Sequence, residues 1–68
     1  MKRGAKFAEA NVPVPEKWSY WTFEYRIGFD AGKRFKKYFP APGAETWRER
    51  ARAAFRAGWR DARKQAKT

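Results

Sequence analysis

Apolar positions recur every three or four residues in two stretches of the chain, which is the spacing that places side chains on one face of an α-helix. The first stripe comprises Trp18, Trp21, Tyr25, Gly28 and Gly32, and the second comprises Trp47, Ala51, Phe55, Gly58 and Ala62. The pattern predicts one helix over about 16–37 and a second helix over about 44–65. Residues 38–43 hold two prolines and a glycine, so they form the predicted connector.

A connector of this length typically joins two antiparallel neighbours. The sequence therefore predicts an all-α fold, an antiparallel two-helix hairpin over residues 15–66. Residues 1–14 are mostly small or polar, and Pro13-Val14-Pro15 favours extended backbone. We expect this N-terminal segment to be extended, and either flexible or docked on the hairpin.

A short aromatic-Arg-apolar-Gly-aromatic word occurs twice. The two copies are Tyr25-Arg26-Ile27-Gly28-Phe29 and Phe55-Arg56-Ala57-Gly58-Trp59. A glycine inside a helix costs about 1 kcal/mol relative to alanine, so each should make room for a neighbour. A turn centred between residues 41 and 42 places Gly28 opposite Phe55 and Gly58 opposite Tyr25. We predict that these four residues close the hairpin, with an aromatic side chain seated over each glycine.

The apolar stripe of the first predicted helix is wider than a contact with one other helix requires. Either the N-terminal segment covers the excess or another molecule does. Trp18, Tyr20 and Phe23 are consequently candidates for a protein-binding patch, and the alternative is that they belong to the core.

The amino-acid composition excludes several kinds of functional site. The chain has 68 residues with no cysteine and no histidine, so it has no disulfide and lacks the usual ligands and bases of zinc, thiol and imidazole sites. It also lacks a glycine loop that could cradle phosphates. We expect no catalysis, no cofactor and no metal. Neither a signal-like apolar run nor a membrane-length one is present, which predicts a cytoplasmic protein without a membrane partner.

The net charge is +10, from 17 basic and 7 acidic residues, and this excess favours a polyanionic partner. Twelve of the basic residues but only three of the acidic ones fall within 33–68, so we assign the contact to that half. Arginine suits phosphate and base contacts, and Tyr38 could stack on a base. The candidate nucleic-acid-binding residues are Lys33, Arg34, Lys36, Lys37, Tyr38, Arg48, Arg52, Arg56, Arg60, Arg63 and Lys64.

The alternative is an inert, solvated helix face on which opposite charges pair. Three pairs with suitable spacing are Glu45 with Arg48, Glu49 with Arg52, and Asp61 with Lys64. Such pairs contribute only a few tenths of a kcal/mol each. Three carboxylates cannot neutralise the seven basic residues of the second helix, so polyanion contact remains the favoured interpretation.

Two motifs resemble those of the bacterial ribosome modulation factor family. They are Gly28-Phe29-x-Ala31-Gly32 and Arg52-x-x-Phe55-x-x-Gly58-Trp59-Arg60-Asp61-Ala62, and the resemblance spans about 22–64. It implies a two-helix protein that binds the small ribosomal subunit near the messenger exit and promotes ribosome dimerisation and silencing. The chain departs from the family at Tyr38-Phe39-Pro40, where the family usually has a Cys-Pro-Tyr run, and about fifteen N-terminal residues have no counterpart.

Two functional hypotheses follow. The first is a non-catalytic protein that binds ribosomal RNA or the small ribosomal subunit and modulates translation. The second is a small phage-type protein that inhibits a host protein complex by covering an acidic surface. The sequence leaves the oligomeric state open.

Overall fold

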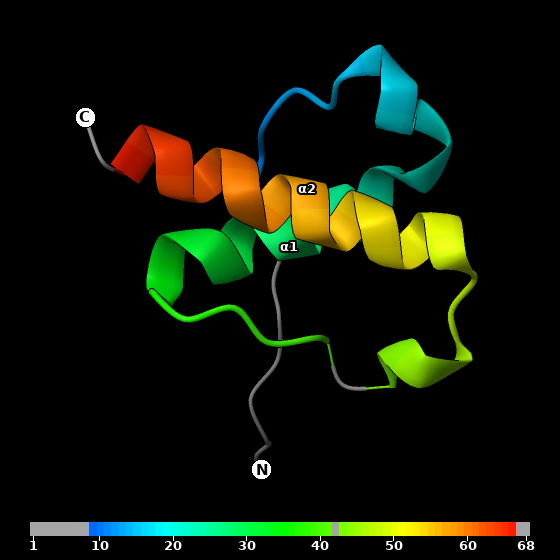
Figure 1. Ribbon diagram of the computed structural model, residues 1–68. Helices are drawn as coiled ribbons and strands as arrows, with labels where there is room; N and C mark the ends of the chain where they lie inside the picture. Colours follow the sequence, from blue (N-terminus) through cyan, green and yellow to red (C-terminus); the bar gives the residue numbers. More distant parts are fainter. Residues whose placement is uncertain (1–8, 42, 67–68) are drawn as a thin grey trace, which may run out of the picture.

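The computed structural model describes residues 9–41 and 43–66, and it is helical apart from extended segments. Its elements are the short 3-10 helix η1 (Glu16–Trp21), α1 (Thr22–Arg34), a second 3-10 helix η2 (Ala44–Thr46) and α2 (Glu49–Ala66). The described residues contain no strand. The two α-helices pack directly on each other, so the predicted all-α fold built on two packed helices is confirmed (Figure 1).

Both helices are shorter than predicted at the connector. α1 ends at Arg34 because Phe35 adopts extended dihedral angles, and the Phe35 ring then packs edge-on against Phe39 with centroids 5.2 Å apart. At the far side Trp47 is also extended, so α2 starts at Glu49 rather than near residue 44. The connector of the folded chain is therefore residues 35–48, which include η2.

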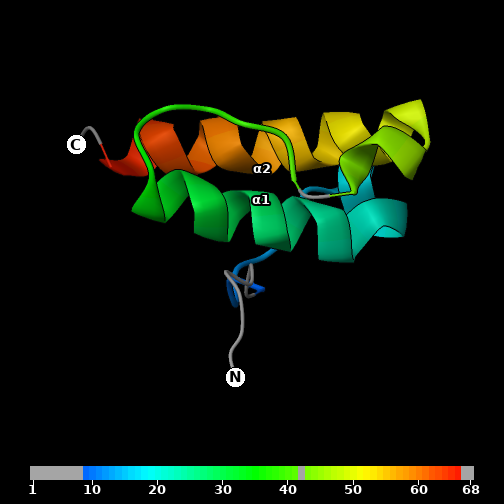
Figure 2. The same ribbon diagram turned by 90° about the horizontal axis from the view of Figure 1, so that it is seen from below.

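The direction of the helices differs from the prediction: α1 and α2 run parallel. At their starts, the Arg50 guanidinium lies 5.7 Å from the ring of Trp18. At their other ends, Arg63 donates a hydrogen bond of 3.1 Å to the carbonyl of Gly32. The two views agree, since both helices proceed in the same direction along the molecule (Figures 1 and 2). The antiparallel arrangement is wrong.

The connector explains this reversal. Six extended residues cannot return along a helix spanning 16–37, which would be about 33 Å long. The actual α1 has 13 residues and a length of about 20 Å. Residues 35–48 can reach more than 40 Å at about 3.3 Å per residue, enough to run back along the pair and start α2 beside the start of α1. Figure 2 shows this return path across one side of the helices.

Glycines set the distance between the helices. A Cβ atom on Gly28 would overlap the backbone carbonyl oxygen of Phe55, and one on Gly58 would overlap that of Tyr25. The two predicted pairings are thus present, but the partner of each glycine is backbone rather than an aromatic ring. A Cβ atom on Gly32 would lie 2.8 Å from the Cβ of Ala62. Gly-x-x-x-Gly in α1 and Gly-x-x-x-Ala in α2 therefore permit the close crossing of two parallel helices.

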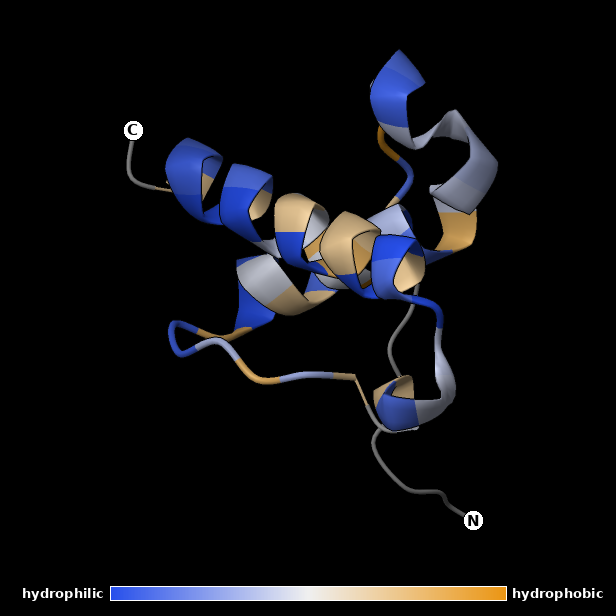
Figure 3. Cartoon of the chain, turned by 45° about the vertical axis from the view of Figure 1, so that its right-hand side comes forward, coloured by the Kyte–Doolittle hydropathy of each residue, from blue (hydrophilic) through white to orange (hydrophobic). Residues whose placement is uncertain are grey.

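Extended chain covers both flanks of the crossing. On one flank the N-terminal segment docks through Ala10, Val12 and Val14, which pack near Tyr25 and Phe29. On the other, the connector residues Ala41, Ala44 and Trp47 pack against the cluster of Ile27, Ala31 and Phe55. Hydrophobic and hydrophilic residues alternate along α2, as its orange and blue segments show (Figure 3). The chain itself therefore covers the part of the first stripe around Tyr25 and Ile27, whereas Tyr20 and Phe23 stay exposed.

Arg26 secures the N-terminal segment. Its carbonyl accepts a hydrogen bond of 3.2 Å from the Ala10 N–H, and its Nε donates to the carbonyl of Val12 at 3.1 Å. Its guanidinium also lies 4.0 Å from the carboxylate of Glu9. Residues 9–14 are therefore docked, one of the two predicted states, and residues 1–8 lie outside the described part of the chain.

Candidate nucleic-acid interface

The parallel arrangement brings the two predicted basic clusters to one end of the molecule. Lys33 and Arg34 close α1, and Lys36 and Lys37 follow at the start of the connector. The last turns of α2 lie beside them, as the Arg63–Gly32 hydrogen bond shows. We call this region the basic end, and its members are Lys33, Arg34, Lys36, Lys37, Arg60, Arg63 and Lys64. An antiparallel pair would have separated these clusters by the length of a helix.

Most cations of the basic end have no carboxylate partner. Arg34 pairs with Asp30 at 2.9 Å and Asp61 accepts a hydrogen bond from Tyr25. Within 9–41 and 43–66, no carboxylate lies within ion-pair distance of the remaining members, which are Lys33, Lys36, Lys37, Arg60, Arg63 and Lys64. The carboxyl ends of both helices also point here, and their partial negative charges stabilise nearby cations.

The opposite end of the molecule is balanced in charge. Its acidic residues are Glu16, Glu24, Glu45 and Glu49, and its basic residues are Lys17, Arg48, Arg50 and Arg52. The excess positive charge is therefore concentrated at one end of the helix pair rather than distributed along its length. Such a distribution orients a protein toward a polyanion.

Two of the candidate arginines brace the fold. Arg52 is half-buried and its Nη1 donates to the carbonyls of Trp47 at 2.6 Å and Ala44 at 3.3 Å. Arg63 is also half-buried and ties α2 to the end of α1 through Gly32. These hydrogen bonds satisfy carbonyls at the ends of helical segments. The sequence did not predict this role, because the spacing of residues does not reveal which backbone carbonyl groups lie near Arg52 and Arg63 in the folded chain.

The other arginines of the second helical segment are exposed. Arg56 and Arg60 lie one turn apart on the outer face of α2, whereas Arg48 precedes α2 at the balanced end. The three acid–base pairs proposed for an inert face do not form: none lies within 4.0 Å in the described ranges. Arg56 and Arg60 therefore remain available for an external anion.

Tyr38 has a packing role that the sequence did not indicate. Its ring lies edge-on to Trp59 with centroids 5.2 Å apart, and 6.1 Å from Phe55. It is 36% exposed, so only part of the ring faces solvent. The main contacts of Tyr38 are therefore with Trp59 and Phe55 of α2, and only part of its ring is accessible for stacking on a base.

The candidate protein-binding residues divide in two. Tyr20 is 83% exposed and Phe23 is 51% exposed. Trp18 instead packs against the core cluster, and its ring lies 5.4 Å from Lys17 Nζ and 5.7 Å from the Arg50 guanidinium. We refer to Tyr20 and Phe23 as the aromatic tip, which lies at the balanced end.

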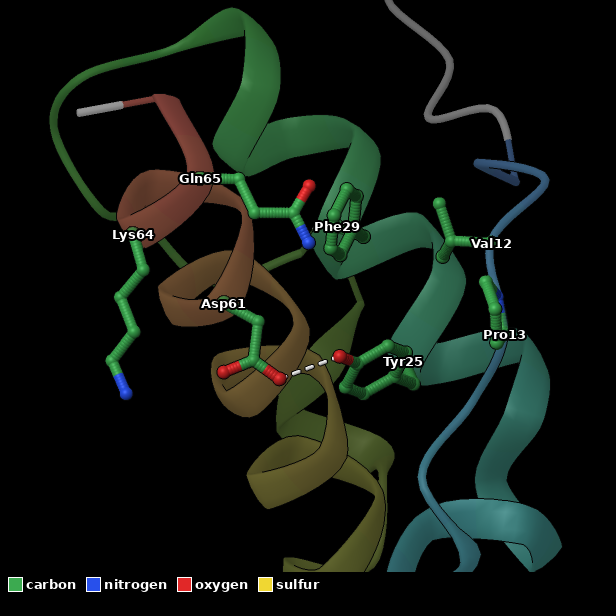
Figure 4. A pocket seen from close by; sticks show the side chains of 7 residues that line it. All are labelled: Val12, Pro13, Tyr25, Phe29, Asp61, Lys64 and Gln65. Carbon is green, nitrogen blue, oxygen red and sulfur yellow. Dashed lines mark hydrogen bonds between the residues drawn. The ribbon is translucent and has the colours of Figure 1, made fainter. Parts of the chain in front are cut away.

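A buried tyrosine and a carboxylate join the helices beside the N-terminal segment (Figure 4). The Tyr25 hydroxyl donates a hydrogen bond of 2.5 Å to Asp61 Oδ2. Burial raises the pKa of Tyr25 well above its usual value, and the hydrogen bond to Asp61 and the charge of its carboxylate raise the pKa further. This pair was missed from the sequence because it depends on the parallel direction, which brings Asp61 beside Tyr25.

No protein-family model, curated protein or solved structure matches this chain. Among the residues that the structure describes, no three His, Cys, Asp or Glu side chains gather as a metal site would require. In the same part of the chain, no helix is both long and apolar enough to cross a membrane.

Proposed function

We propose that this protein is a non-catalytic RNA-binding protein whose basic end docks on structured RNA, with ribosomal RNA of the small subunit as its target and modulation of translation in the cytoplasm as its role. The observation that carries this proposal is the basic end itself. Cations from two distant parts of the sequence converge there, and most of them have no carboxylate partner.

Phosphate binding accounts for the charge distribution better than solubility does. A solubilising charge gains nothing from collecting at one end, whereas a row of unpaired cations matches the phosphates of a folded RNA. If about five phosphates are neutralised, the logarithm of the binding constant should fall with the logarithm of the salt concentration with a slope of about −4 to −5. This slope is the quantitative signature of the proposed interface.

The resemblance to the ribosome modulation factor family supports the ribosome as the source of that RNA. Its motif residues Gly28, Gly32, Gly58 and Ala62 lie at the helix crossing, so they hold the fold. The motif residue Arg60 belongs to the basic end. The resemblance therefore covers both the residues that hold the helix crossing and one exposed cation of the basic end.

A pair of matched variants tests the proposal. Arg60→Gln/Lys64→Gln removes two unpaired cations from the basic end, and Lys17→Gln/Arg48→Gln removes the same charge from the balanced end. The protein is sedimented with purified ribosomes at rising salt, with an RNase-treated sample beside it. We expect the first variant to reduce the salt slope by about 2 and the control to leave it unchanged. Equal loss in both variants would show that net charge, not the basic end, governs binding.

A second candidate function rests on the aromatic tip. Exposed aromatic rings are typical anchors of protein interfaces, and Tyr20 and Phe23 stay largely exposed, although the Tyr20 ring also packs edge-on against Trp21. The tip is the surface by which a small inhibitor would grip a host protein complex. Tyr20→Ser/Phe23→Ser should then abolish capture of a protein partner that survives RNase treatment, while ribosome sedimentation is retained.

A further inference from the structure

A hollow opens beside the basic end, between the N-terminal segment and the last turns of α2. It consists of two adjoining cavities of about 470 and 340 Å³, which share Val12, Phe29 and Gln65 as lining. Both volumes fall within the range of about 300–1,000 Å³ that is usual for small-ligand sites. Three separate chain segments build the hollow, so it exists only in the folded protein.

The polar groups of the hollow are few and differ along its length. The charged groups are Asp61 and Lys64 in the first cavity and Lys33 in the second, and the Gln65 amide lines both. Asp61 Oδ2 receives the Tyr25 hydroxyl, which fixes the carboxylate in place (Figure 4). A carboxylate offers about four lone-pair positions, so acceptor capacity remains after this one bond.

These groups define the chemistry of a ligand. Cations at the rim favour a phosphate, the apolar lining of Val12 and Pro13 favours a flat apolar body, and the fixed carboxylate favours a pair of adjacent N–H donors. Among the four RNA bases, only guanine presents two such donors side by side, at N1 and N2. Adenine, cytosine and uracil each place at least one acceptor next to their donor on the pairing edge, which a carboxylate repels.

We propose that the hollow binds an unpaired guanine nucleotide, with its pairing edge at Asp61 and its phosphate near Lys33 or Lys64. This inference rests on the proposed RNA-binding function and names the nucleotide that the RNA presents there. The guanine must be unpaired, because in a duplex its N1 and N2 donors are already bonded to cytosine. The site would give a charge-driven RNA contact its base specificity.

Free nucleotides test the hollow without requiring RNA binding. The full chain is titrated with GMP, IMP and AMP while its backbone amide signals are followed by NMR. Inosine lacks the N2 amino group but is otherwise guanine, so IMP isolates one hydrogen bond to the carboxylate. We expect GMP to bind roughly ten-fold more tightly than IMP and to shift the amides of Val12, Asp61 and Lys64. AMP should bind more weakly than both.

Asp61→Asn is the decisive variant. It keeps a side-chain oxygen for the Tyr25 hydroxyl but replaces the second acceptor by a donor, so the preference for GMP over IMP should disappear. Asp30→Asn removes the same charge from a carboxylate of α1 that pairs with Arg34 and does not line the hollow, so it should leave the preference intact. A thermal melt of each variant establishes that the fold is retained.

A hairpin RNA with one bulged guanosine, compared with the same hairpin carrying inosine or adenosine, separates the two proposals. Preference for the guanosine bulge that Asp61→Asn removes supports both. RNA binding that depends on the basic end but ignores the bulged base overturns the guanine site alone. GMP selectivity without any RNA binding overturns the proposed function and retains the site. Absence of GMP selectivity in the intact protein refutes the site outright.

Discussion

Gly28→Ala isolates the contact on which the parallel helix pair depends. The new Cβ would overlap the carbonyl oxygen of Phe55 and lie 2.8 Å from its carbonyl carbon and 2.9 Å from its Cα. All three obstacles are backbone atoms, so no side chain can turn away to make room. The helices must separate, and separation also loosens the matching contact between Gly58 and Tyr25.

Two terms of opposite sign determine the size of the effect. Alanine favours the helix by about 1 kcal/mol over glycine. Overpacking costs about 1–3 kcal/mol and occasionally more, and a backbone obstacle places this site at the upper end or beyond. We expect a net loss of about 2 kcal/mol. A chain of 68 residues is stable by roughly 3–10 kcal/mol, so this loss should lower Tm by about 8–16 °C.

Thermal and urea denaturation followed by circular dichroism measure the loss. Ala53→Gly, on a half-exposed position of α2, reports the propensity term alone, about 1 kcal/mol. Gly58→Ala should behave like Gly28→Ala, and the double variant should lose less than the sum, because the first separation relieves the second overlap. A Gly28→Ala protein with an unchanged or raised Tm would refute the close backbone crossing.

Three further predictions address direction, bracing and pH. The chain has no cysteine, so spin labels at Lys33→Cys and Ala66→Cys should report a short distance, whereas a distribution beyond about 25 Å would contradict the parallel pair. Arg52→Met should lower the free energy of unfolding by about 1.5–3 kcal/mol in urea melts and leave the salt slope of RNA binding unchanged, and a reduced slope with intact stability would reverse the assigned role. Because the pKa of Tyr25 is raised in the folded state, its contribution is present below its unfolded pKa of about 10 and is lost as pH rises above that value. Melts of the wild type and Tyr25→Phe should therefore converge at high pH, and a constant difference between them would argue against the Asp61 interaction.

The sequence carried enough information for the helices and for the residues at their crossing, but not for their direction. Gly28 near Phe55 and Gly58 near Tyr25 are compatible with both directions. In an antiparallel pair these residues lie directly opposite each other, and in a parallel pair each glycine lies one helical turn, three residues, beyond the counterpart of its neighbour. Gly32 distinguishes them, since its neighbour is Ala62 and not a residue early in α2. The direction of α2 depends on where α1 ends, because an early end lengthens the connector enough for it to return along the pair. The sequence defines this end poorly, since the residues beyond it, Phe35 to Lys37, are also compatible with a helix.

The candidate site was predictable in composition and unpredictable in arrangement. Residue type and charge bias pointed to Lys33–Lys37 and to the arginines of α2, and these do form much of the basic end. The division of the arginines into braces and exposed cations depends on carbonyl groups brought close by the fold, as for Arg52 and Trp47. The Tyr25–Asp61 pair and the hollow beside it required both the parallel direction and the docked N-terminal segment.

The two copies of the repeated word are equivalent at the helix crossing but differ in the residues that they expose. Positions thirty apart are equivalent in the pair, as the matching overlaps at Gly28 and Gly58 show. Arg26 is thereby the counterpart of Arg56, but the N-terminal segment binds Arg26 and leaves Arg56 exposed. Asp30 is the counterpart of Arg60, so the same place on the two helices bears opposite charge. One copy of the word anchors the covering segment, and the other is free to meet a polyanion.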